Sequence, residues 1–153
     1  MLTLATEKDT LALGAALAAE AQRGDVIALV GPLGAGKTTL ARGFIQRLTT
    51  YDEEVVSPTF TLVQVYEAAA APVWHFDLYR LDNANDALEL GFEDALATGI
   101  SLIEWPERLG ALLPAKHLKV ALSSAGLGRQ ADLSGGPAWV DRIAAVSKYV
   151  SGT

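Results

Sequence analysis

Three features of the 153-residue sequence predict an α/β fold, in which helices flank a mixed parallel and antiparallel sheet. Strand-like and helical segments alternate early in the chain, as they do when helices connect parallel strands. Later strand-like segments follow one another across short loops, which is typical of antiparallel hairpins. The length suits one domain, and half of the residues are hydrophobic, which is enough to build one core.

The first third of the chain predicts two helices on either side of a buried strand. Thr6 caps a helix that runs from near Glu7 to about Gln22. The continuous apolar run 26–30 is typical of a strand that is buried on both faces. The helix after the next glycine-rich turn has apolar residues at four-residue spacing, namely Leu40, Phe44 and Leu48.

The rest of the chain predicts shorter elements. Residues 55–67 are interpreted as a short strand or loop, interrupted by Pro58, and then a longer strand from Phe60. The remaining segments are expected to be a hairpin loop (68–72), a strand (73–81), one or two short helices (82–99), a buried strand stopped by Pro106 (100–105), a closing hairpin (118–125 and 129–135) and a helical tail (about 138–150). Together they predict one domain over residues 1–153.

The composition excludes several kinds of function. The formal net charge is −6, and an acidic surface disfavours unaided binding to nucleic acid, because Lys and Arg contacts to phosphates supply most of that affinity. The absence of cysteine excludes disulfides, zinc–thiolate sites and a thiol nucleophile. We see no signal peptide and no apolar run near the roughly 20 residues of a membrane span. We therefore expect a cytoplasmic protein with no membrane partner.

The stretch GPLGAGKT, residues 31–38, matches the phosphate-binding pattern G-x-x-x-x-G-K-[ST]. Glycines let successive backbone N–H groups point at one anion, and the helix that starts near Lys37 adds the positive end of its dipole. Lys37 supplies a charge for the β and γ phosphates, and Thr38 offers a hydroxyl to Mg²⁺. Because an apolar strand precedes the stretch and an amphipathic helix follows it, we expect nucleotide binding rather than an ordinary turn.

Two acids are candidates for the rest of the site. Phosphoryl transfer needs a second anchor for Mg²⁺ and a group that orients the attacking oxygen. Glu104 ends the apolar stretch ISLIE, where a carboxylate is costly unless it meets a cation, and Asp77 lies within HFDLY. Each acid could instead be a solvated or salt-bridged residue at a strand end, and Arg80 is near enough in sequence to pair with Asp77.

Three other features allow two interpretations each. The hydroxyls of SPTFT, residues 57–61, suit a switch segment that a γ-phosphate and Mg²⁺ would order, or the start of an ordinary Thr-rich strand. Trp105 could pack in the core or cover the site. His75 and His117 show no metal-ligand spacing, so we interpret both as structural or surface residues.

Four stretches, GPLGAGKTTLARGF, SPTFTLVQVY, HFDLYRL and LIEWPERLG, closely resemble the bacterial ATPase family of tRNA threonylcarbamoyladenosine biosynthesis, called TsaE and formerly YjeE. The likeness extends to about Arg129. It implies a compact P-loop NTPase-like domain that binds ATP and Mg²⁺ and hydrolyses ATP slowly alone. It also implies two partners, the threonylcarbamoyl transferase subunit and its paralogous partner, which modify the adenosine next to the anticodon. The ATPase would reset that complex between turnovers, and no direct tRNA binding by this chain is expected.

The resemblance implies roles for three groups of residues. Asp77, Glu104 and Lys37 would be catalytic, with Asp77 near the attacking water. Thr38 and Glu104 would hold Mg²⁺. Further nucleotide contacts would come from Gly34, Ala35, Gly36, Lys37, Thr38, Thr39, Thr59 and Trp105 and, near the base, from Glu7 and Arg129.

Two other functions are compatible with a phosphate-binding loop. A small P-loop kinase would need an acceptor site and usually an Arg-rich lid, whereas residues 82–99 offer mainly acids. A regulatory module would bind ATP without needing to hydrolyse it. The effect of Asp77→Ala on hydrolysis and on tRNA modification would separate this regulatory module from an ATPase.

Overall fold

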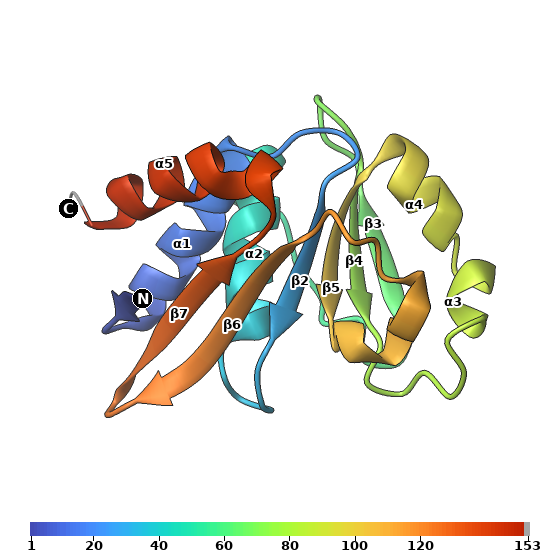
Figure 1. Cartoon of the computed structure of the whole chain (residues 1–153), viewed down its shortest axis with the longest axis horizontal. Helices are drawn as coiled ribbons and strands as arrows, with labels where there is room; N and C mark the ends of the chain where they lie inside the picture. The colour runs from blue at the N-terminus through green and yellow to red at the C-terminus, as the bar shows by residue number, and fades with distance from the viewer. Residues whose placement is uncertain (152–153) are drawn as a thin grey trace.

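The computed structural model describes residues 1–151, and a seven-stranded sheet lies at its centre (Figure 1). The strands lie in the order β1-β7-β6-β2-β5-β4-β3 across the sheet. Their bounds are Leu2–Leu4 (β1), Val26–Val30 (β2), Val63–Tyr66 (β3), Val73–Asp77 (β4), Ile100–Glu104 (β5), Leu118–Ala125 (β6) and Gly128–Ser134 (β7).

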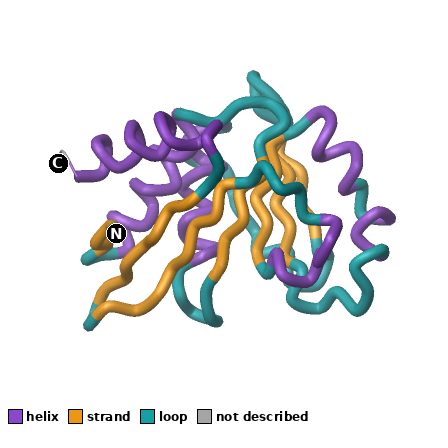
Figure 2. Tube along the Cα trace, viewed as in Figure 1, coloured by secondary structure: helices purple, strands orange, loops and turns teal. Residues whose placement is uncertain are grey.

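The middle of the sheet is parallel and both sides are antiparallel. β2 runs parallel to β5 and β6, and β4 runs parallel to β5. The pairs β3–β4, β6–β7 and β1–β7 are antiparallel. The mixed α/β sheet expected from the sequence is therefore confirmed. Since parallel strands end at the same edge, the loops that follow β2, β4 and β5 gather along the lower edge in Figure 2.

Helices cover both faces of the sheet (Figure 1). The helices α1 (Glu7–Ala19), α2 (Lys37–Leu48) and α5 (Val140–Ser151) lie on one face, and α3 (Asp86–Glu89) and α4 (Phe92–Thr98) lie on the other. Each face has its own core, in which Leu13, Leu40 and Phe44 are buried under the first set and Phe76, Phe92 and Ile103 under the second. Two 3₁₀ helices, Pro106–Leu112 (η1) and Pro137–Trp139 (η2), follow β5 and β7.

Two glycines let α1 and α2 pack closely. A Cβ on Gly14 of α1 would lie 2.1 Å from the Leu40 carbonyl oxygen, and a Cβ on Gly43 of α2 would lie 2.3 Å from the Leu11 carbonyl oxygen. Real Cβ atoms do not approach backbone this closely, so a side chain at either position would push the helices apart. These glycines therefore set the position of α2, whose first turn follows the glycine-rich loop.

Two strands are shorter than the sequence predicts. The strand expected from Phe60 begins at Val63, because Leu62 adopts a left-handed φ of 69° in the turn before it. The next strand, expected to reach residue 81, ends at Asp77. There the Asp77 carboxylate accepts a 3.1 Å hydrogen bond from the Tyr79 N–H and helps to turn the chain away.

The N-terminal region agrees with its prediction in part. Thr6 caps α1 through a 3.4 Å hydrogen bond from the Asp9 N–H, as expected, but the helix ends at Ala19 instead of near Gln22. β1 was not predicted from the sequence, because three residues are too short to show a strand pattern. The 3₁₀ helix η1 was not predicted either. No helix in the described part of the chain is both long enough and apolar enough to cross a membrane.

Candidate functional site

The loop between β2 and α2, residues 31–36, is shaped for the close approach of an anion. Gly34 and Gly36 have φ values of 79° and 102°, which glycine adopts without strain. α2 begins directly at Lys37, and within the described chain no side chain caps its first turn. The N–H groups of that turn and the positive end of the helix are therefore available to a ligand.

Lys37 is buried beside this loop. Its Nζ donates a 2.6 Å hydrogen bond to the Gly31 carbonyl and lies 3.6 Å from the centre of the Trp105 ring. Burial lowers the pKa of Lys37, and the nearby charges of Glu104 and Asp77 oppose that shift. The ammonium is thus close to the loop and to both candidate acids.

Asp77 and Glu104 lie side by side at the ends of the parallel strands β4 and β5. Both are buried, with exposed fractions of 7% and 3%. The Thr38 hydroxyl lies 3.2 and 3.1 Å from the two carboxylate oxygens of Glu104 and donates to them. Burial raises the pKa of Asp77, the hydrogen bond from the Tyr79 N–H opposes this shift, and the charge of Glu104 adds to it.

These groups line a cavity of about 300 Å³ at the edge where β2, β4 and β5 end. The residues around it are Leu33, Gly34, Gly36, Lys37, Thr38, Thr39, Ser57, Thr59, Asp77, Glu104, Trp105 and Arg129. The fold therefore brings the glycine-rich loop, both acids and the SPTFT segment together. Ala35 is different, because its side chain is buried in the core on the α1–α2 face, so only its backbone could contact a ligand.

A second cavity of about 240 Å³ shares Gly36, Thr39 and Arg129 with the first. Glu7 lines this second cavity from the start of α1.

Two polar contacts border the second cavity. Glu7 accepts a 2.8 Å hydrogen bond from Arg42 Nη2, and Arg129 Nη2 donates a 2.9 Å hydrogen bond to the Gly34 carbonyl. Both residues expected near a base, Glu7 and Arg129, thus line the second cavity, whereas Asp77 and Glu104 line only the first.

The SPTFT segment is a turn rather than the start of a strand, so the ordinary-strand interpretation is wrong. The Ser57 and Thr59 hydroxyls lie 2.8 Å apart, and both residues line the first cavity. Thr61 instead accepts a 3.2 Å hydrogen bond from Gln64 Nε2. Ordering of the segment by a ligand stays a prediction.

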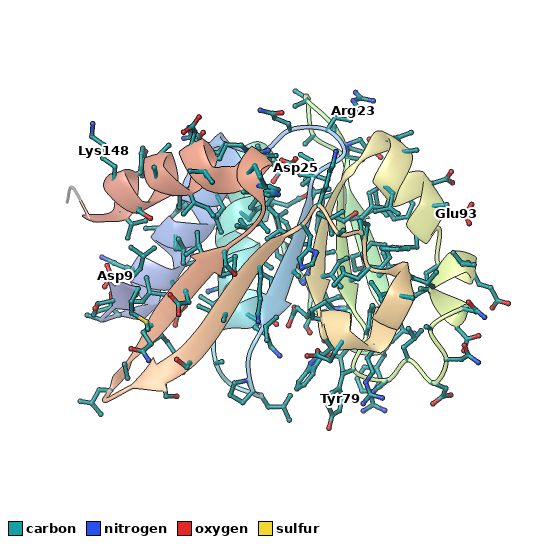
Figure 3. All side chains as sticks on the ribbon, in the orientation of Figure 1. Asp9, Arg23, Asp25, Tyr79, Glu93 and Lys148 are labelled. Carbon is teal, nitrogen blue, oxygen red and sulfur yellow. The ribbon has the colours of Figure 1, made fainter. Side chains whose placement is uncertain are left out.

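Trp105 both borders the cavity and packs against the core on the α4 face. Its left-handed φ of 60° ends β5 at Glu104 and turns the ring toward Lys37. The ring centre lies 4.9 Å from that of Tyr79, which Figure 3 shows at the lower edge of the molecule. The two interpretations of Trp105 are therefore not exclusive.

His75 contacts a residue of the candidate site, and this contact was not predicted from the sequence. It is fully buried, not on the surface, and its Nε2 lies 2.7 Å from Glu104 Oε2. His75 precedes Asp77 by two residues in a strand, so both side chains point to the same face of the sheet. That spacing was the available signal in the sequence.

The oxygen atoms at the first cavity suit Mg²⁺. This ion prefers hard oxygen ligands, and in nucleotide sites one or two protein groups hold it together with phosphates and water. The Thr38 hydroxyl and the Glu104 carboxylate provide such oxygens within 3.2 Å of each other. The residues present therefore fit a magnesium–nucleotide complex.

Comparison with known proteins gives consistent results. A family model described as threonylcarbamoyl adenosine biosynthesis protein TsaE matches residues 4–131. Two curated relatives, from Rickettsia conorii and Bacillus subtilis, are both called tRNA threonylcarbamoyladenosine biosynthesis protein TsaE. They are 40% and 36% identical over 124 and 120 residues, which cover 81% and 78% of this chain and 71% and 74% of those proteins.

A solved structure supports the same likeness. The crystal structure of Bacillus subtilis YdiB matches this chain with a TM-score of 0.80 at 29% sequence identity. The match covers 96% of this chain and 93% of that one.

Proposed function

The chain belongs to the TsaE family of threonylcarbamoyl adenosine biosynthesis proteins, and we propose that it is a slow Mg²⁺-dependent ATPase within that pathway. Its turnover would support the transferase complex that makes threonylcarbamoyladenosine next to the anticodon of tRNA. The observation that carries the proposal is the first cavity, where the phosphate-binding loop, Lys37, Thr38 and two buried acids meet.

The loop and the start of α2 would bind the triphosphate. Backbone N–H groups of residues 34–39 would donate to the phosphate oxygens, and the Lys37 ammonium would leave the Gly31 carbonyl to reach the β and γ phosphates. Thr38 and Glu104 would hold Mg²⁺, which neutralises charge on the transferring phosphoryl group. Thr59 would contact the same end of the nucleotide, and Trp105 would cover it.

Asp77 is the best-placed group for the attacking water. It lines the cavity beside Glu104 and is held by the Tyr79 N–H. Its carboxylate would accept a hydrogen bond from the water and orient the oxygen toward the γ-phosphorus, as catalytic acids do in phosphoryl transfer. The reaction is ATP plus water to ADP, phosphate and a proton.

The second cavity would take the nucleoside end of ATP. Glu7 and Arg129 border it, and it meets the first cavity at Gly36 and Thr39. The partners would be the threonylcarbamoyl transferase subunit and its paralogue. With a net charge of −6, this chain would leave tRNA binding to them, and the complex would work in the cytoplasm.

Reconstitution tests this function. The chain is mixed with the transferase pair, threonylcarbamoyl-AMP and tRNA, and modification is followed beyond one turnover with ATP or with a non-hydrolysable analogue. We expect multiple turnovers with ATP only. We also expect Asp77→Asn to reduce ATP hydrolysis by about 100-fold or more, as loss of a positioned acid–base group does, and to stop multiple turnovers.

One control variant and two alternative outcomes interpret the reconstitution. Asp94→Asn removes an exposed carboxylate on α4 and should leave both activities unchanged. Multiple turnovers with the analogue would favour the regulatory module, because hydrolysis would then be unnecessary. Transfer of phosphate from ATP to an added small molecule would favour the kinase.

A further inference from the structure

His75 occupies a position where packing alone does not require a polar side chain. It lies in the middle of β4, and Val73, two residues earlier on the same face of the sheet, packs in the α1–α2 core. Its Nδ1 atom has no hydrogen-bonding partner among residues 1–151. Because a buried polar atom without a partner costs free energy, the presence of the imidazole has to be explained by its other nitrogen.

That other nitrogen contacts Glu104. Nε2 of His75 lies 2.7 Å from Glu104 Oε2, which is shorter than the 3.1 and 3.2 Å contacts from Thr38. An ionised carboxylate can only accept hydrogen bonds, so Nε2 is the donor in this contact. The carboxylate of Glu104 is thus held from two sides, by Thr38 of α2 and by His75 of the neighbouring strand.

We propose that His75 is a positioning residue that holds the Glu104 carboxylate in the orientation needed to bind Mg²⁺ beside Thr38. This inference rests on the proposed function. The residues that line the two cavities at the loop do not include His75, so it would act through Glu104 and not on the nucleotide. Without the imidazole, the buried carboxylate would lose its shortest hydrogen bond and could turn toward the nearby Lys37 ammonium. Outer hydrogen bonds of this kind change metal affinity by about 10- to 100-fold.

Two variants of the full chain separate positioning from packing. His75→Leu keeps an apolar side chain of similar size but removes the donor. His75→Gln keeps a donor nitrogen at the same distance along the side chain. The probe is Mn²⁺, whose free fraction is measured by electron paramagnetic resonance with the protein saturated by ADP. ADP affinity is measured separately in EDTA, and folding is followed by thermal unfolding.

We expect His75→Leu to weaken Mn²⁺ binding by about tenfold or more, and His75→Gln to recover most of that loss. ADP affinity in EDTA should stay within about twofold for both variants, because the phosphate contacts do not involve His75. Equal Mn²⁺ affinity in wild type and His75→Leu would overturn the proposal. So would equal losses of metal-free ADP binding in both variants, because that result indicates a general structural role.

A measurement on the unmodified protein covers the case in which a variant does not fold. The chain has two histidines, so nitrogen-15 spectra of the imidazole groups are readily assigned. We expect a proton on His75 Nε2. An Nε2 atom without a proton would contradict the hydrogen bond and the proposal with it. Failure of the wild-type protein to bind Mn²⁺ with ADP would instead contradict the proposed function itself, and the positioning role with it.

Discussion

Lys37 makes two contacts that a triphosphate would have to replace, one with the Gly31 carbonyl and one with the Trp105 ring. We expect Lys37→Ala to weaken ATP binding by about 10- to 100-fold, because hydrogen bonds to charged groups contribute about 1.5–3 kcal/mol. Isothermal titration calorimetry with ATP and Mg²⁺ measures this change. Lys148→Ala is the matched control, since Figure 3 shows Lys148 on α5, far from the loop. Equal ATP affinity in the Lys37 variant and wild type would contradict the site.

Asp77, which we propose orients the attacking water, also affects stability through its pKa. Burial raises the pKa of the folded-state carboxyl above its unfolded value, so the ionised form costs stability at neutral pH. As pH falls through the folded pKa, the native protein takes up the proton and the cost decreases. Below the unfolded pKa of about 3.9 the cost is absent, because both states are protonated. We therefore expect Asp77→Asn to raise the melting temperature at pH 7.

Thermal unfolding of wild type and Asp77→Asn between pH 4 and 8 tests this sign, with buffers chosen so that unfolding stays reversible. The difference in melting temperature should be largest at neutral pH and shrink toward pH 4. Asp94→Asn, at an exposed position, should give little difference at any pH. If the Asp77→Asn protein were less stable than wild type at pH 7, the ionised carboxylate would be net stabilising, which contradicts the expected sign.

At this scale the sequence predicts which residues lie together where the signal is local. Lys37, Thr38 and the loop lie in one contiguous stretch whose spacing reflects its geometry. The contact between His75 and Glu104 spans 29 residues and two strands. This contact depends on β4 lying next to β5. The spacing of residues within one strand does not indicate which strand lies beside it.

At the scale of elements, the contact between α1 and α2 positions the candidate site. We expect Gly43→Ala to destabilise the protein by about 1–3 kcal/mol, because the added methyl would meet the Leu11 backbone in a packed core. Chemical denaturation measures the free energy of unfolding. Gly136→Ala is the control, since a Cβ there meets no atom within 4 Å and its φ of −75° suits any residue. Equal stability of both variants would show that α1 and α2 can separate without cost.

The accuracy of each predicted element follows its length and its periodicity. The strand 26–30 has its predicted bounds and the helix after the loop begins at Lys37 as predicted, because a continuous apolar run and a four-residue repeat are strong signals. β1 has three residues and exists through its pairing with β7, so it carries almost no local pattern. The early turn at Leu62 depends on a left-handed backbone that a β-branched-rich sequence does not indicate.

At the scale of the whole molecule, a mostly buried ion pair and the candidate site lie at opposite edges of the sheet. Arg142 of α5 forms a bidentate ion pair with Asp25, just before β2, and its guanidinium lies 3.8 Å from the centre of the Trp139 ring. Figure 3 shows Asp25 at the upper edge and Tyr79 at the lower edge. The site is therefore remote from this pair.

We expect Arg142→Leu to destabilise the protein by about 3 kcal/mol, because it leaves the mostly buried Asp25 carboxylate unpaired. ATP affinity should stay within about twofold at a temperature where the variant is folded. Thermal unfolding and calorimetry measure the two effects, with the exposed Arg47→Leu as control. A large loss of ATP affinity in folded Arg142→Leu would show that the two edges are coupled.

Assembly of the site is a property of the whole sheet. Asp77 and Glu104 meet because β4 and β5 are parallel neighbours in register, and Glu104 meets Thr38 because β5 lies beside β2. The sequence indicated that Glu104 ends an apolar strand and placed Asp77 inside another strand, but strand order and register are set by packing across the whole chain.

We propose that residues 31–38 hold the phosphates of a nucleotide, with Thr38 and Glu104 at its metal. A crystal structure with Mg²⁺ and a non-hydrolysable ATP analogue tests this most directly. We expect phosphates against the backbone of residues 34–39, the metal within ligand distance of Thr38, and Asp77 facing the γ-phosphate. A nucleotide bound elsewhere, or an ordered triphosphate with Asp77 and Glu104 turned away from it, would rule out this site.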